Sequence, residues 1–167
     1  MIRKALFDDL EEIMGIIRAT VAEMREYNNT QWDENYPGEK DFINDINNQD
    51  LYVAEQNDKL VGFVCINKVE PVEYAGLKWT LKETCMVVHR MAVNINFRRE
   101  GIGSELMKFA ENLALSNNIR YLKTDTYSIN TKMNALFKKC GYTFVGKMNF
   151  LGKEKPFNCY EKVLNNE

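Results

Sequence analysis

The sequence predicts one domain of mixed α/β class, of the α+β kind, spanning residues 1–167. Two patterns predict this class: apolar residues recur at helical spacing in several segments, and short apolar runs bounded by turn residues lie between them. The length sets the domain count, because 167 residues bury one good core and rarely two. We therefore expect a strongly twisted sheet flanked by helices, with the most apolar strand at its centre.

The N-terminal part predicts a strand, a helix and a loop. Residues 2–6 are expected to form a short strand. Asp8 is expected to cap the helix, with Glu11 as its capping-box partner. The helix itself is predicted by apolar residues three and four positions apart, namely Leu10, Ile13, Met14, Ile17, Val21 and Met24. The polar loop over residues 27–38 contains Trp32 and Tyr36, and it is a candidate to cover a ligand.

The rest of the chain alternates between the same two patterns. Helices are expected over residues 39–47, from the Gly101 and Gly103 turn to Asn117, and over 131–139; strands are expected over 51–56, 60–67, 84–93, 121–126, 143–148 and 158–163. Residues 57–59 supply the turn of a hairpin, and Gly141 supplies a helix stop. The run over 84–93 is almost continuously apolar, which favours the central position in the sheet.

Composition excludes several classes of protein. The formal net charge of −2 gives no bulk attraction to nucleic acid. No apolar run resembles a signal peptide or reaches membrane-spanning length, so we expect a cytoplasmic protein without a membrane partner. The four cysteines are widely spaced, and this predicts reduced, mostly buried thiols and no metal site.

The stretch from Met91 to Leu106 carries the clearest chemical signal, because a buried strand leads through a glycine turn into a helix. The first turn of a helix presents unpaired N–H groups and a partial positive charge. Glycines allow an anion to approach the backbone closely, and Arg98 and Arg99 add positive charge. The segment therefore predicts an anion site, although Gly101 and Gly103 alone are equally typical of a structural turn.

Other phosphate-binding loops fit this stretch poorly. A dinucleotide site of the G-x-G-x-x-G type needs a third glycine where Leu106 stands, and no G-K-[ST] tripeptide marks a nucleoside-triphosphate loop. The run Arg98-Arg-Glu-Gly-Ile-Gly103 instead matches the [QR]-x-x-G-x-[GA] signature of the GNAT acetyltransferases. The run from Asn130 through Met133, Leu136 and Phe137 to Gly141-Tyr142 resembles the second signature of that family, N-x-x-A-x-x-[LF]-Y-x-x-x-G-F.

This resemblance covers essentially the whole chain and implies a fold and a co-substrate. The GNAT fold is a twisted, mostly antiparallel sheet of six to seven strands with a splayed central pair, flanked by about four helices. The co-substrate is acetyl-CoA, with its pantetheine beside the backbone of Met91, Ala92 and Val93 and a backbone N–H near Ala92 stabilising the oxyanion. The resemblance places the pyrophosphate on the backbone N–H groups of the turn, Arg98, Arg99, Glu100, Gly101, Ile102, Gly103 and Ser104.

Two further positions follow from the second signature. Asn130 matches the asparagine that bonds the pantetheine amides in the family, and it is equally a helix N-cap. Phe137 stands where the family commonly has a tyrosine that protonates the departing thiolate, so this chain departs from the pattern there. Tyr142 and Tyr160 are possible substitutes, or Phe137 packs beside the thioester. A thiol with a pKa near 8.5 leaves as thiolate at a cost of only about 2 kcal/mol.

His89 is the candidate general base, because it is the only histidine and precedes Met91 by two strand positions. Arylalkylamine acetyltransferases carry histidines at the positions of Val87 and His89. A structural role for His89 on the strand is the competing interpretation. Glu83 and Asp33, acting through water, are the other candidates.

The acceptor is expected to be a primary amine of a small molecule or a peptide N-terminus. Trp32 and Tyr36 are candidate contacts to it, because loops before the early strands border the acceptor in this fold. Burial of the tryptophan as a loop anchor explains them equally well. The Gln-Trp and Tyr-Pro loop also resembles that of uncharacterised bacterial members. The alternative function is a catalytically silent acyl-CoA sensor or scaffold, and we expect a monomer or homodimer in either case.

Overall fold

The computed structural model describes residues 1–165 and divides into two compact units. The first unit contains residues 1–66 and 90–106, and the second contains residues 67–89 and the chain from Met107 onward. The boundaries between the units therefore fall within two strands and one helix. The prediction of a single domain therefore stays a prediction.

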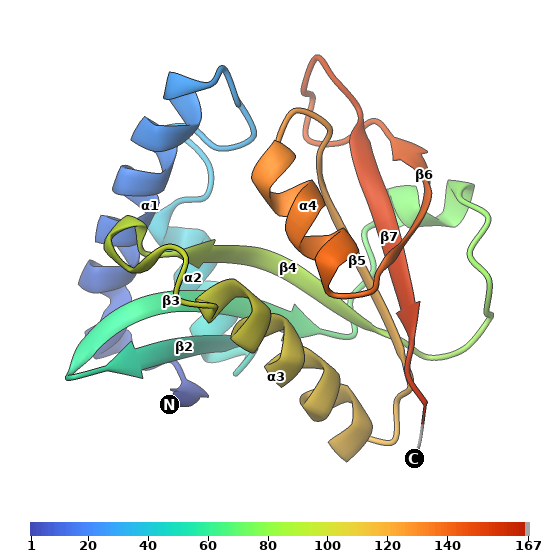
Figure 1. Cartoon of the computed structure of the whole chain (residues 1–167), viewed down its shortest axis with the longest axis horizontal. Coiled ribbons are helices and arrows are strands. Elements are labelled where there is room, and N and C mark those ends of the chain that lie inside the picture. Colours follow the sequence, from blue (N-terminus) through green and yellow to red (C-terminus); the bar gives the residue numbers. More distant parts are fainter. Residues whose placement is uncertain (166–167) are drawn as a thin grey trace. The chain divides into compact units, whose positions relative to one another are not determined.

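Seven strands and four α-helices occur within the described residues (Figure 1). The strands are β1 (Ile2–Lys4), β2 (Leu51–Gln56), β3 (Lys59–Asn67), β4 (Met86–Val93), β5 (Tyr121–Tyr127), β6 (Thr143–Met148) and β7 (Phe157–Val163). The helices are α1 (Leu10–Glu26), α2 (Glu39–Asn47), α3 (Ile102–Ser116) and α4 (Thr131–Lys139). The strand order is β1-β2-β3-β4-β5-β7-β6, so the apolar run predicted to be central is the fourth of seven.

The sheet is mostly antiparallel, as predicted, with one parallel pair. β1–β2, β2–β3, β5–β7 and β6–β7 run antiparallel, whereas β4 and β5 run parallel with Val88 opposite Thr124. A parallel pair needs a crossover, and α3 supplies it. The mixed α/β class and the expected sheet are therefore confirmed. The splay of the central pair falls at the boundary between the units and stays a prediction.

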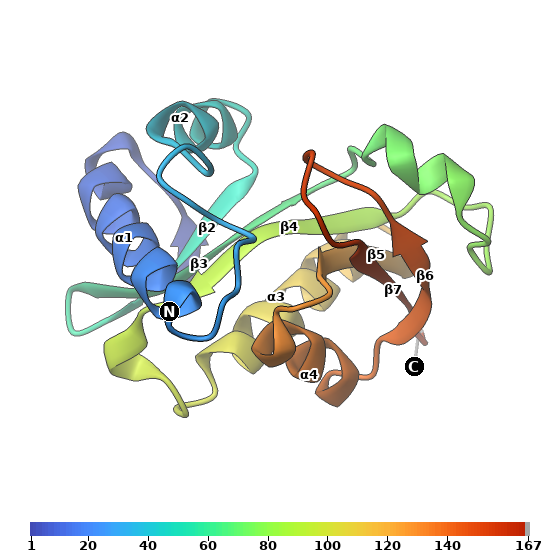
Figure 2. The ribbon, with the colours of Figure 1, turned by 90° about the horizontal axis from the view of Figure 1, so that it is seen from above.

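In the first unit, α1 and α2 cover one face of β2 and β3 (Figure 2). Ile13, Ile17 and Val21 repeat at helical spacing and are buried, as the sequence predicted for this helix. Phe42 of α2 meets Phe63 of β3 edge to face, with ring centroids 5.2 Å apart. Each such buried ring contributes about 1.5–3 kcal/mol through burial alone, so this core holds the helices on the sheet.

The predicted cap of α1 was wrong. Asp9, not Asp8, occupies the N-cap position, after a short 3-10 turn over Phe7–Asp9. The Asp9 carboxylate accepts the Leu6 N–H at 2.7 Å and pairs with both terminal nitrogens of Arg3. These contacts lower the pKa of Asp9, with the bond from Arg3 as the largest cause. Asp9 thus occupies the N-cap position without a side-chain bond to the helix, because its carboxylate binds Leu6 and Arg3.

In the second unit, β5, β7 and β6 lie between two layers (Figure 2). α4 packs on one face, where Asn134 bonds Tyr160 of β7. Residues 67–82, called here the covering segment, lie over the other face, where Tyr74 and Trp79 join a core with Tyr121 and Phe157. No helix or strand was predicted over residues 68–82. The structure has a short 3-10 turn there, over Val72–Gly76.

Turn positions agree with the residue types found there. Asn57 and Asp58 have positive φ of 51° and 62°, which a two-residue hairpin between β2 and β3 requires. Gly141 has a φ of 86° directly after α4, which confirms the predicted helix stop. All four cysteines are free thiols, and Cys140 is the one that is not buried.

Candidate functional site

The segment after β4 is fastened to the β2–β3 hairpin. The Asn94 N–H donates to the Val61 carbonyl oxygen at 2.8 Å, and the Asn94 side chain accepts the Asn96 N–H. This asparagine caps a short 3-10 turn over Ile95–Phe97. The end of β4 and the start of the glycine turn are therefore held to β3 by a backbone bond within the first unit.

Arg98 does not present a free positive charge at the turn. Its Nε donates to the Val93 carbonyl oxygen at 3.1 Å, and its Nη1 pairs with the Glu23 carboxylate at 2.8 Å. The side chain thus ties the turn to β4 and to α1, and its backbone remains the part available to an anion. Arg99, in contrast, is exposed.

The turn itself has the backbone shape of an anion cradle. Arg99 and Gly101 have positive φ of 69° and 79°, and α3 begins directly afterwards at Ile102. A Cβ built on Gly101 would meet nothing within 4 Å, so space is open at this point. Positive-φ residues before a helix aim successive N–H groups to one side, which suits a phosphate. Ile102 is buried, whereas Gly103 and Ser104 are half-buried.

Gly62 of β3 is a positioning residue that sequence reasoning missed. A Cβ at this position would lie 3.0 Å from the Ala92 carbonyl oxygen and 3.2–3.3 Å from side-chain carbons of Leu106 and Ile102. The absence of a side chain therefore lets β3, β4 and the start of α3 approach closely. An isolated glycine inside a strand pattern was the available signal for such an approach.

The backbone of β4 beside the turn is largely covered. Met91 and Ala92 are buried and Val93 is half-buried. Ala92 belongs to the core under α1 and α2. Their side chains thus serve packing, and any contact that these three residues make to a ligand has to come from the backbone.

The loop candidates Trp32 and Tyr36 are both engaged in structure. Trp32 is buried in the core of the first unit, as the loop-anchor interpretation required. Tyr36 is half-buried, and its hydroxyl accepts a hydrogen bond of 3.1 Å from Arg90 Nη1. Burial raises the pKa of Tyr36, so it stays a neutral phenol near neutral pH.

Arg90 and Asp45 form a buried ion pair that the sequence did not indicate. The Arg90 Nη2 lies 2.6 and 2.7 Å from the two Asp45 carboxylate oxygens, and its Nε lies 3.0 Å from one of them. Burial raises the pKa of Asp45, and the bonds from Arg90 oppose that rise. Strand β4, helix α2 and the Tyr36 loop therefore meet at one guanidinium. An arginine in an apolar strand run was the only sequence signal.

His89 lies in the second unit, where its Nε2 is 2.6 Å from the Asn67 side-chain oxygen Oδ1. The same Oδ1 accepts the Val69 N–H at 2.9 Å. A backbone N–H only donates, so this atom is the amide oxygen and the ring Nε2 must donate to it. A neutral His89 therefore carries its lone pair on Nδ1, which defines the atom through which it would act as a base.

The weaker base candidates already hold other groups. The Asp33 carboxylate accepts the N–H groups of Asn35 and Tyr36 and so shapes the loop. Glu83 pairs with Arg120 at 2.6 Å on the surface. His89 is likewise held by Asn67, so all three stay candidates.

Asn130 and Phe137 both lie in the second unit and are buried. Asn130 caps α4, because its Oδ1 accepts the Met133 N–H at 3.1 Å. Phe137 packs between Tyr142 and Tyr160, with ring centroids 6.1 and 5.5 Å away. The Tyr160 hydroxyl donates to Asn134, whereas the buried Tyr142 hydroxyl has no partner among the described residues.

Two variants of Asn130 separate its cap from its predicted cofactor contact. Asn130→Ala removes the cap and should lower the free energy of unfolding by about 1 kcal/mol. Asn130→Asp keeps an N-cap oxygen but loses the amide donor, so stability should be retained while acetyl-CoA affinity falls. Denaturant titration and calorimetry on both variants measure the two effects. Equal acetyl-CoA affinity in Asn130→Asp and wild type would leave Asn130 with the cap alone.

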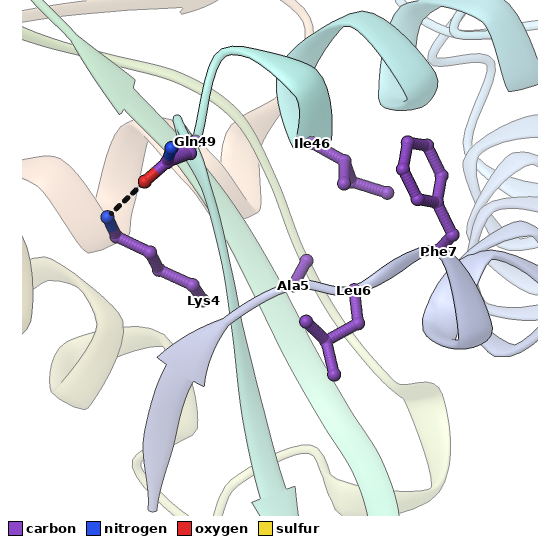
Figure 3. A pocket seen from close by; sticks show the side chains of 6 residues that line it. All are labelled: Lys4, Ala5, Leu6, Phe7, Ile46 and Gln49. Carbon is purple, nitrogen blue, oxygen red and sulfur yellow. Dashed lines mark hydrogen bonds between the residues drawn. The ribbon is translucent and has the colours of Figure 1, made fainter.

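Other site classes find little support in residues 1–165. No group of three or more His, Cys, Asp and Glu side chains in this range is arranged to hold a metal ion. None of the helices described is both long and apolar enough to span a membrane. A shallow, open pocket is lined by Lys4, Ala5, Leu6, Phe7, Ile46 and Gln49 (Figure 3). None of these belongs to the glycine turn or carries a group suited to acyl transfer.

Comparison with known proteins defines the class. A family model described as the acetyltransferase (GNAT) family matches residues 11–142. The chain therefore belongs to the GNAT acetyltransferase family, whose members generally use acetyl-CoA and act on amine acceptors. The uncharacterised N-acetyltransferase YesJ of Bacillus subtilis is 23% identical over 146 residues, which are 85% of this chain and 81% of that protein.

Two further matches are a sequence relative and a solved structure. Streptothricin acetyltransferase of Escherichia coli is 27% identical over 123 residues, covering 72% of this chain and 64% of that protein. A GNAT-family acetyltransferase from Streptococcus agalactiae has a crystal structure that matches with a TM-score of 0.88 at 24% identity, over 99% of this chain and 96% of that one. The second match establishes the fold, and the named relatives support an acetyltransferase enzyme.

Proposed function

We propose that this chain transfers the acetyl group of acetyl-CoA to a primary amine, on a small molecule or a peptide N-terminus. The amine attacks the thioester directly, through a tetrahedral intermediate. The observation that carries the proposal is the turn of Arg99 and Gly101 at the start of α3, with positive φ and open space at Gly101. Membership of the GNAT family supplies the reaction class.

The backbone of the turn is the proposed phosphate site. The N–H groups from Arg98 to Ser104 would hold the pyrophosphate, because helix N-termini attract anions and Gly101 leaves room for one. Arg99 is exposed and adds charge, whereas Arg98 acts by fastening the turn to Glu23. The backbone of Met91, Ala92 and Val93 is proposed to bind the pantetheine arm, with an N–H near Ala92 as the oxyanion contact.

His89 is proposed to take the proton of the amine at Nδ1. An amine with a pKa near 10.4 pays about 4.6 kcal/mol to lose its proton at neutral pH, so a base contributes directly to the rate. The bond from Nε2 to Asn67 supports this assignment, because it fixes both the tautomer and the ring orientation. One relative is named a streptothricin acetyltransferase, which agrees with acetyl transfer as the reaction class.

A charge at Gly101 tests the proposed acetyl-CoA site. Gly101→Asp places a carboxylate where the phosphate should lie, so we expect calorimetry to give at least tenfold weaker acetyl-CoA binding, or about 1.4 kcal/mol. Gly101→Asn is the matched control, because asparagine has the same shape and tolerates positive φ about as well. The loss of acetyl-CoA affinity in Gly101→Asn should be much smaller. A folded Gly101→Asp protein with wild-type affinity would rule out this site.

A further inference from the structure

The covering segment of the second unit meets the sheet through polar contacts as well as through its aromatic core. Glu70 pairs with Lys123 of β5, the Tyr74 hydroxyl donates to Asp125 Oδ1 at 2.5 Å, and the Thr80 N–H donates to Glu161 of β7 at 3.0 Å. Buried polar groups are costly unless they are matched. Lys123, Asp125 and Glu161 therefore each need a counter-ion or hydrogen-bond partners for their charge.

Lys123 and Glu161 are fully matched by their neighbours. Lys123 has the Glu70 carboxylate as its counter-ion, and its Nζ lies 4.3 Å from the centroid of the Trp79 ring. Glu161 accepts hydrogen bonds from Thr80 and from the Tyr121 hydroxyl. These contacts are typical of a structural network, and they need no further ligand.

Asp125 differs from both of them. Within residues 1–165 its only hydrogen bond comes from Tyr74, on one of its two oxygens, and no lysine or arginine pairs with it. It is also the one residue of β5 that is not buried, since the other six are. The second carboxylate oxygen is not among the fully buried side-chain atoms that lack a partner, so it keeps some contact with solvent.

The charged and titratable groups around Asp125 leave it without a cation. Tyr74 and Glu73 face it from the covering segment, Cys159 is opposite on β7, and Lys123 lies two positions back on its own strand, already paired with Glu70. On β4, His89 follows Val88, the partner of Thr124, and is held by Asn67. Burial raises the pKa of Asp125 to about 6, and the Tyr74 bond offsets only part of that rise.

Aromatic residues lie near Asp125 in the covering segment and along β5. Tyr74 lies 4.9 Å from Trp79, and Tyr127, two positions along β5 from Asp125, lies 5.1 Å from Phe157 between ring centroids. Phe150, from the connection before β7, meets Phe157 at 5.3 Å. Ring faces attract cations and also accept apolar chains. A partly buried carboxylate with aromatic residues in its neighbourhood is the composition of a site for an organic ammonium ion.

We propose that Asp125 is the specificity-determining residue for the acceptor, and that its second carboxylate oxygen binds a positively charged nitrogen of that acceptor. The proposal rests on the acetyltransferase function above and narrows the acceptor to cationic amines with an apolar portion, such as diamines and arylalkylamines. Tyr74 is a positioning residue, because its hydroxyl holds the first oxygen and leaves the second one without a hydrogen-bond donor among the described residues.

The test measures amine binding without acetyl-CoA, using 1,5-diaminopentane, spermidine and phenethylamine as probes in calorimetry. Asp125→Asn keeps an oxygen for Tyr74 but removes the charge, so we expect at least tenfold weaker binding of the best probe. In wild type that affinity should fall about tenfold per pH unit below pH 6, because protonation removes the charge that the ammonium needs. Asp125→Asn should abolish this pH dependence.

Two further variants separate a direct contact from a structural or general charge effect. Glu73→Gln removes a nearby negative charge and should change probe affinity less than threefold. Tyr74→Phe removes a bond that lowers the pKa of Asp125, so the fall in affinity should begin at a higher pH. Asp125→Asn binding within threefold of wild type, or no binding of any probe to wild type, overturns the proposal. If wild type and Asp125→Asn turn over an amine with acetyl-CoA at the same rate, the proposed enzyme function stands. Only the proposed role of Asp125 is then rejected.

Discussion

Replacing His89 by glutamine should lower kcat/KM for the best amine by about a hundredfold or more, while acetyl-CoA affinity stays nearly unchanged. The size follows from the usual contribution of a general base. Glutamine has an amide N–H that can keep the bond to Asn67 Oδ1, but it has no basic nitrogen. The substitution thus removes the proton acceptor with little disturbance of the strand. Steady-state kinetics on both proteins, across pH 5 to 9, measure the loss.

Asn67 provides the matching control for His89. Asn67→Asp places a carboxylate against the ring Nε2–H, which favours the protonated ring, so the acid limb of kcat/KM should move to higher pH. A His89→Gln enzyme within threefold of wild type, with a pH profile that follows the amine alone, would leave His89 with a structural role. The pH dependence of His89 is measured in kcat/KM. The pH dependence of Asp125 is measured in amine binding without acetyl-CoA, so the two effects can be told apart.

Replacing Arg90 by methionine should destabilise the protein by about 3 kcal/mol at neutral pH. The change leaves the Asp45 carboxylate buried without its counter-ion, and removing one partner of a buried pair is far costlier than removing both. The Tyr36 hydroxyl loses its donor as well. Denaturant unfolding followed by fluorescence measures the change, because Trp32 lies in the same unit.

The pH dependence of this variant identifies the cause. Without Arg90 the folded-state pKa of Asp45 rises further above its unfolded value of about 3.9, so stability is greatest below that value and falls as pH rises. The loss relative to wild type should therefore shrink near pH 4.5. The double variant Arg90→Met with Asp45→Asn should recover much of the stability. A deficit that is equal at both pH values would point to lost packing instead.

The fold was largely predictable because local patterns and tertiary structure agree. The helices over 39–47 and 131–139 are confirmed at both ends, and β4 begins two residues after its predicted start. Helix periodicity and turn residues act locally, so one sequence suffices to find them. The predicted cap of α1 was wrong by one residue, because the local pattern did not reveal the 3-10 turn that precedes the helix.

The candidate site was predictable from the sequence only where it depends on backbone conformation. The positive φ of Gly101 follows from residue type and neighbours. The partnerships of Arg90 with Asp45, and of Tyr74 with Asp125, join residues 45 and 51 positions apart. No periodicity links such positions, and an arginine or aspartate in a strand does not indicate its partner. The engagement of Arg98 by Glu23 was hidden for the same reason.

Gly62 sets a limit on how the sequence of this protein can diverge. Two of the three atoms that crowd it belong to the side chains of Leu106 and Ile102, and smaller residues there would relieve the crowding. The third is a backbone oxygen, that of Ala92, which no substitution removes. Compensating mutations can therefore open only part of the space. In a library randomised at 62, 102 and 106, selection for activity should recover varied residues at the two helix positions and glycine alone at 62.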